Sequence, residues 1–172
     1  MVKDLDYLRI TYEHAEANSP DLSTRIGAIL VRNGEVIVRE ANRFPEGVIV
    51  KPERLTKRPE KYEYIEHAET NAIYTAISNG ITDFSDIKMY CNFMICGKCA
   101  RTVIRLAKGI ELIGHQIPLE WGANLARETG KNDWQKSINA AWEMLDEAGI
   151  KYRYVYGKIG VKNLYAGRIM IA

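Results

Sequence analysis

The sequence has no long apolar run, and nothing in it approaches the roughly 20 apolar residues that a membrane-spanning helix needs. Its first residues, Met-Val-Lys-Asp-Leu-Asp, are too polar and acidic for a signal peptide. Internal repeats, low-complexity tracts and linkers are also missing. These absences predict one domain over residues 1–172, located in the cytoplasm and without a membrane partner.

The sequence also has little net charge, because the formal value of +2 is too small to indicate a nucleic-acid partner. After Glu147, however, acidic residues disappear, and basic residues alternate with tyrosines. Such a pattern can bind a phosphate backbone and stack bases, which keeps nucleic acid open as a partner. An edge strand followed by a docked tail is the favoured interpretation. The residues are Lys151, Arg153, Lys158, Lys162, Arg168, Tyr152, Tyr154, Tyr156 and Tyr165.

Cysteine is scarce, and three cysteines cannot all pair within one chain. Two of them form the motif Cys96-Gly97-Lys98-Cys99. In a chain without a secretion signal, this spacing indicates a metal site or redox chemistry rather than a structural disulfide. We interpret Cys91, within an apolar run, as a small buried residue.

Hydrophobic periodicity predicts an α/β fold. An Asn33-Gly34 turn joins the first two predicted strands as a hairpin, and later strands alternate with helices. This order predicts a three-layer α/β/α sandwich with a mixed, roughly five-stranded sheet. The expected helices are 4–17, 65–78, 97–108 and 134–147, the expected strands are 25–31, 35–38, 87–92, 110–113 and 152–156, and a polar segment spans 41–64.

Two predicted helices begin with metal-binding side chains. His67 lies near the start of one helix, and Cys96 and Cys99 open the next. One helix, a turn and one strand fit between them, so the two helix starts can lie side by side. One imidazole and two thiolates give zinc three ligands and leave the fourth position for water.

Glu69 follows His67 by two residues, where a carboxylate can move protons for a zinc-activated water without binding the metal. The tripeptide alone is weak, because His14-Ala15-Glu16 repeats it inside the first helix. We interpret that copy as part of a solvated face. His115 follows a strand, and a loop histidine with surface contacts is preferred over one that borders the site.

His67-Ala68-Glu69 followed by a Cys-x-x-Cys helix resembles the zinc-dependent cytidine and deoxycytidylate deaminase superfamily. The resemblance extends over about residues 1 to 115 and is closest to the deoxycytidylate deaminase branch. It implies that Asn42 contacts the sugar, that the backbone at Ala68 holds the pyrimidine carbonyl, and that the protein forms homo-oligomers. The family has proline where this chain has Ile95; isoleucine can adopt the same backbone conformation at a helix start, although the change bears on the pocket wall.

The expected function is therefore hydrolytic deamination of a cytosine nucleotide, with dCMP converted to dUMP. One alternative keeps the chemistry but changes the substrate to a nucleoside, a base, a modified pyrimidine nucleotide or an adenosine in RNA. A second alternative is a catalytically silent zinc-bearing module on the same fold. A purely structural zinc site would not require Glu69, which favours the enzyme.

Overall fold

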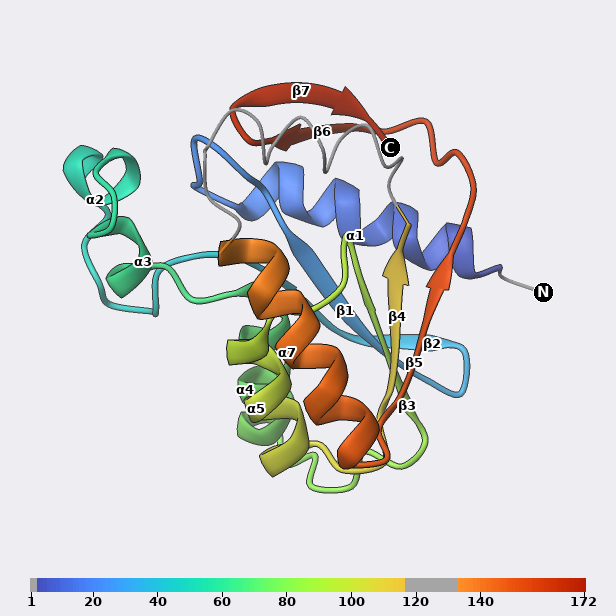
Figure 1. Ribbon diagram of the computed structural model, residues 1–172. Coiled ribbons are helices and arrows are strands. Elements are labelled where there is room, and N and C mark those ends of the chain that lie inside the picture. The colour runs from blue at the N-terminus through green and yellow to red at the C-terminus, as the bar shows by residue number, and fades with distance from the viewer. Residues whose placement is uncertain (1–2, 117–132) are drawn as a thin grey trace.

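A five-stranded sheet forms the centre of the computed structural model, which describes residues 3–116 and 133–172 (Figure 1). Its strand order is β2-β1-β3-β4-β5. β1 pairs with β2 and β3 in antiparallel fashion, whereas β3–β4 and β4–β5 are parallel. The mixed sheet is therefore confirmed. The strands are β1 Gly27–Arg32, β2 Glu35–Ala41, β3 Ile87–Cys91, β4 Glu111–His115 and β5 Lys151–Val155.

Helices cover both faces of this sheet, as the three-layer prediction required. α1 (Asp4–Asn18) lies on one face, and α4 (Ala68–Ser78), α5 (Gly97–Leu106) and α7 (Asp133–Glu147) lie on the other (Figure 1). Side chains alternate between the two faces of a strand, so β1 contributes residues to two hydrophobic cores, one on each face of the sheet. Ala28 and Leu30 pack with the three-helix layer, whereas Ile29 and Val31 pack with α1. Within the described ranges, no helix combines the length and apolarity needed to cross a bilayer.

α1 lies very close to the sheet at Gly27, the first residue of β1. A Cβ atom placed on Gly27 would lie 2.1 Å from the carbonyl oxygen of Thr11, a backbone atom that cannot move aside alone. Glycine is therefore required here by space rather than by its dihedral angles. The contact fixes the end of β1 that pairs with Ala41 of β2.

Three element predictions need correction. The polar segment contains two short helices, α2 (Pro52–Thr56) and α3 (Lys61–Tyr64). The second predicted helix of the sequence begins at Ala68 rather than near Ile65. The C-terminal tail forms an unpredicted hairpin of β6 (Lys162–Tyr165) and β7 (Arg168–Ile171).

The hairpin was missed because its turn is unusual. Ala166 has φ 53° and Gly167 has φ 79°, and alanine rarely occupies the left-handed region. Its sequence therefore lacks the asparagine or aspartate that normally marks such a turn. For the residues before this hairpin, the prediction of an edge strand is confirmed, because β5 lies at the edge of the main sheet.

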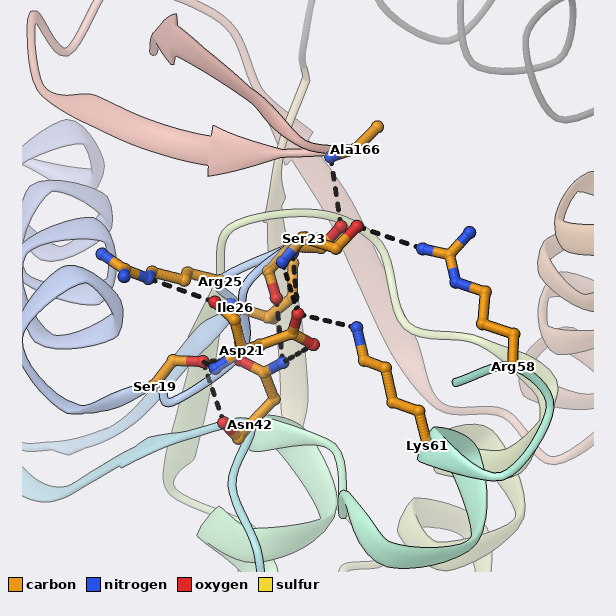
Figure 2. A network of polar contacts seen from close by, with 10 residues as sticks. Ser19, Asp21, Ser23, Arg25, Ile26, Asn42, Arg58, Lys61 and Ala166 are labelled. Carbon is orange, nitrogen blue, oxygen red and sulfur yellow. Dashed lines mark hydrogen bonds and ion pairs between the residues drawn. The ribbon is translucent and has the colours of Figure 1, made fainter. Parts of the chain in front are cut away.

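A buried ion pair ties the segment between β2 and α4 to the rest of the protein (Figure 2). Lys61 Nζ lies 2.6 Å from Asp21 Oδ1, and the two side chains are only 5% and 4% exposed. The same Asp21 oxygen accepts hydrogen bonds from the backbone N–H groups of Ser23 and Thr24. Arg58 adds a second tether through its hydrogen bond to Ser23 Oγ.

We predict that Lys61→Met destabilises the protein strongly. The substitution leaves Asp21 as an unpaired buried charge, which costs roughly 3–5 kcal/mol of unfolding free energy. Urea denaturation measures the change, and Lys57→Met, an exposed lysine of the same segment, is the matched control. An additional Asp21→Asn substitution should recover part of the loss. Equal midpoints for Lys61→Met and Lys57→Met would contradict the prediction.

Candidate metal centre

Three side chains converge at one edge of the sheet, and their donor atoms all lie within 4.8 Å of one another: His67, Cys96 and Cys99. His67 Nδ1 lies 3.5 Å from Cys96 Sγ and 3.3 Å from Cys99 Sγ, and the two sulfurs are 3.7 Å apart. A tetrahedral zinc ion with ordinary Zn–S and Zn–N lengths sets such ligand atoms roughly 3.5–3.8 Å apart. The donor set and its spacing therefore fit zinc and leave a fourth position for water.

The two helices position these ligands through their first residues. His67 is the N-cap of α4, and Cys96 is the N-cap of α5. Neither side chain caps its own helix, and the two side chains contact each other instead. Cys99 follows one turn later, and the positive end of α5 favours thiolate over thiol at Cys96, the N-cap residue. The predicted juxtaposition of two helix starts is confirmed.

The pKa values of the two cysteine ligands shift in opposite directions. The hydrogen bond between the two sulfurs lowers the pKa of the Cys96 thiol to about 3, against the opposing effect of burial and with help from His67. The same hydrogen bond, together with burial, raises the pKa of Cys99 well above its ordinary value. The two thiols thus differ in acidity, and any thiol proton that they carry must leave when zinc binds both sulfurs.

Glu69 lies in the first turn of α4, and only 6% of it is exposed. Burial raises the pKa of this carboxyl group above its ordinary value, against the opposing effect of the nearby His67 charge. A raised pKa allows a carboxylate to take up and release protons near neutral pH, which suits general acid–base chemistry. The structure therefore places a buried carboxyl group in the first turn of α4, the helix that begins after His67.

Two further residues, which the sequence analysis did not name, contact the ligands or the helix that carries them. Thr70 Oγ1 donates a hydrogen bond to Cys99 Sγ over 3.5 Å. Ser137 Oγ of α7 accepts a hydrogen bond from Gly97 N and so caps α5. Thr70 could have been found from its place beside Glu69 on the helix, whereas Ser137 lies too far along the chain.

Asn42, the predicted sugar contact, lies at the end of β2 and is buried in the polar network of Figure 2. Its amide nitrogen donates to Asp21 Oδ2 and to the carbonyl of Thr24, and its oxygen accepts from Ser19 Oγ and from Ile26 N. All four bonding positions of the amide are thus used within the protein. The sugar contact of Asn42 stays a prediction.

Ala68, the predicted carbonyl contact, is fully buried as the first residue of α4. A pair of backbone hydrogen bonds between Arg43 and Glu66 links the segment after Asn42 to the start of α4. The structure therefore brings Asn42 and Ala68 to the same edge of the sheet as the metal ligands. The role of the Ala68 backbone stays a prediction.

The preferred interpretation of His115 as a surface histidine is wrong. His115 ends β4, is buried, and lies 2.8 Å from Tyr12 Oη through Nδ1 and 2.8 Å from the Gly157 carbonyl through Nε2. Burial lowers the pKa of its imidazole. It therefore joins α1 to the C-terminal segment and is not a member of the ligand group.

The remaining sequence interpretations fit the structure. Cys91 is buried in β3, and His14 lies in α1, where its ring contacts Asn18. Ile95, in place of the expected proline, is fully buried beside the cysteine ligands in the core, and the following Cys96 keeps an extended N-cap backbone. The metal site thus survives the loss of proline.

Several side chains of the basic, tyrosine-rich C-terminal segment make contacts within the protein. Arg153 forms ion pairs of 2.8 Å with both Asp4 and Glu111. Tyr165 is buried against Phe93, and the hydroxyl of Tyr152 contacts Asp146. The ion pairs of Arg153 and the burial of Tyr165 remove these two side chains from any continuous basic and aromatic surface, whereas the Tyr152 contact is exposed.

Comparison with known proteins agrees with this geometry. The family model described as "Cytidine and deoxycytidylate deaminase zinc-binding region" matches residues 1–112. No match was found among curated proteins.

Several solved structures share the fold. The dCMP deaminase of cyanophage S-TIM5, solved with dCMP and dUMP, has a TM-score of 0.63 at 16% identity over 90% of this chain and 99% of its own. The Thermotoga maritima diaminohydroxyphosphoribosylaminopyrimidine deaminase/reductase has a TM-score of 0.55 at 17% identity, covering 88% of this chain and 36% of its own. A point mutant of NE0047 in complex with 8-azaguanine has a TM-score of 0.57 at 15% identity, covering 89% of this chain and 76% of its own. At these identities the similarity shows the cytidine deaminase-like fold.

We predict that His67→Ala and Cys99→Ala each abolish stoichiometric zinc binding, because a site with two protein ligands holds zinc far more weakly than one with three. Elemental analysis of purified protein measures zinc per chain. Cys91→Ala is the matched control, since this third cysteine is equally buried but lies outside the ligand group. Full zinc occupancy in Cys99→Ala would contradict the assignment.

Proposed function

The chain belongs to the cytidine and deoxycytidylate deaminase family, and on this premise we propose that it converts dCMP to dUMP by hydrolytic deamination. The observation that carries the proposal is the buried Glu69, which interacts with His67, Cys96 and Cys99, the three members of the ligand group. A structural zinc site has no use for a buried carboxyl group at that position, whereas a hydrolytic site requires one. A single catalytic domain over residues 1–172, a homo-oligomer and a cytoplasmic location belong to the same proposal.

Zinc bound at this site supplies Lewis-acid activation of a water molecule. Glu69 accepts a proton from the attacking water and delivers it to N3 of the cytosine ring. The water oxygen bonds to C4, and the bond from C4 to the amino nitrogen then breaks. Glu69 passes the second water proton to the departing amino group, so ammonia and a uracil ring are the products.

A nucleotide is favoured over a nucleoside by the resemblance to the deoxycytidylate branch and by the basic segment before α4. The contacts of the basic residues in this segment bear on which of them can hold a 5′-phosphate. Lys61 is committed to Asp21 in a buried pair, so it is not available for this purpose. Arg58 is exposed and donates a hydrogen bond to the Ser23 hydroxyl.

We predict that Glu69→Gln keeps its zinc and loses deamination. The amide cannot accept or deliver the proton, and loss of a general acid–base typically lowers turnover by about 10²–10⁴-fold. Zinc content and initial rates are measured on the same preparation. Glu63→Gln, an exposed acid of the neighbouring segment, should keep parental turnover. Parental turnover in Glu69→Gln would refute the proposed mechanism.

The substrate is tested by an ultraviolet deamination screen with the zinc-loaded protein. The compounds are dCMP, CMP, dCTP, cytidine, cytosine and the adenine counterparts, and we expect the highest kcat/KM with dCMP. Turnover confined to unphosphorylated compounds would overturn the nucleotide assignment. No turnover of any compound would favour the silent zinc-bearing module.

A further inference from the structure

One carboxylate oxygen joins the two halves of the metal centre. Glu66 Oε1 accepts a hydrogen bond from the backbone N–H of His67 over 2.9 Å and another from Lys98 Nζ over 2.8 Å. His67 is the metal ligand that begins α4, and Lys98 lies between the two cysteine ligands of α5. The starts of two helices that are separated along the chain are therefore connected by one atom.

Glu66 is held in place independently of Lys98. Its backbone N–H donates to the carbonyl of Arg43 over 3.0 Å, and its carbonyl accepts from the N–H of Arg43 over 3.2 Å. Arg43 is itself fixed by two hydrogen bonds to the nearly buried carboxylate of Glu40. The Glu66 carboxylate is thus anchored to the end of β2, and Lys98 is drawn toward a fixed point.

The ion pair between Glu66 and Lys98 is too exposed to act mainly by stabilising the whole fold. The Lys98 side chain is 49% exposed and that of Glu66 is 20% exposed. An ion pair this accessible contributes little to global stability, typically a small fraction of the total. Its effect must therefore be local, on the separation and orientation of the two helix starts that carry the ligands.

We propose that Glu66 and Lys98 are positioning residues that hold His67 and the two cysteines at their zinc-binding separation. The metal affinity of a site depends on outer partners that fix its ligands. Here that partner is an interhelix ion pair that also bonds the ligand backbone. This inference rests on the zinc centre of the proposed function but not on its substrate.

The test measures zinc release from the fully loaded protein into a chromophoric chelator. We expect Glu66→Gln and Lys98→Met each to release zinc about tenfold faster or more. Because both variants remove the same contact, the double variant should be no more than about twofold faster than the faster single variant. Lys98→Arg keeps the charge and should remain within about twofold of the parent.

Asp86→Asn is the matched control, because its ion pair with Arg32 is comparably exposed and lies at the opposite end of β1. It should release zinc at the parental rate. Thermal unfolding of the zinc-free proteins provides a second readout, in which the Glu66 and Lys98 variants should match the parent.

Parental release rates in both single variants would overturn the proposal. So would independent effects that multiply in the double variant, because the two side chains would then act separately. A loss of zinc-free stability large enough to account for the faster release would also overturn it. Release into a chelator requires no substrate, so this result stands or falls separately from the assignment of dCMP.

Discussion

Two helix N-termini meet beside the carboxyl end of β3, and the metal centre depends on this meeting. α4 crosses back to β3, and α5 begins soon after it, so the change from antiparallel to parallel pairing at β3 brings both helix starts to one edge of the sheet. The two positive helix ends lower the cost of the Cys96 thiolate. They also repel one another, which makes an anionic group between them favourable. Glu66 supplies that group and bonds to both starts at once.

A buried ion pair anchors the segment between β2 and α4 to the rest of the protein. The segment's only nearly fully buried cation, among the residues that the structure describes, is Lys61, paired with Asp21. A buried pair of this kind adds little net stability compared with apolar residues of the same size, but removing one partner is costly because it leaves an unpaired buried charge. The pair therefore fixes where the segment joins the sheet edge, while α2 remains without buried residues.

Periodicity and motif spacing predicted the strand and helix order of the sheet, the three ligands and Glu69, because these follow from patterns local in sequence. Other features depend on contacts between distant residues. His115 was misplaced because its burial is created by Tyr12 and Gly157, which no local pattern connects to it. The β6–β7 hairpin was missed because alanine at φ 53° is a rare turn residue.

The full hydrogen bonding of Asn42 changes what its predicted role requires. A sugar hydroxyl that bonds to this amide must displace one of four protein partners, each worth about 1 kcal/mol net. Displacing Ser19 Oγ frees a hydroxyl that also bonds to the Asn42 carbonyl, whereas displacing Ile26 N or Thr24 O leaves a backbone group unpaired. The Ser19 position is therefore the least costly entry for a ligand. The Asp21 carboxylate, which is paired with Lys61, accepts a hydrogen bond from the amide nitrogen of Asn42. It therefore keeps that nitrogen directed toward Asp21. Lys61 thus helps to set the orientation of Asn42 through Asp21, so the predicted sugar contact of Asn42 would depend on the segment before α4.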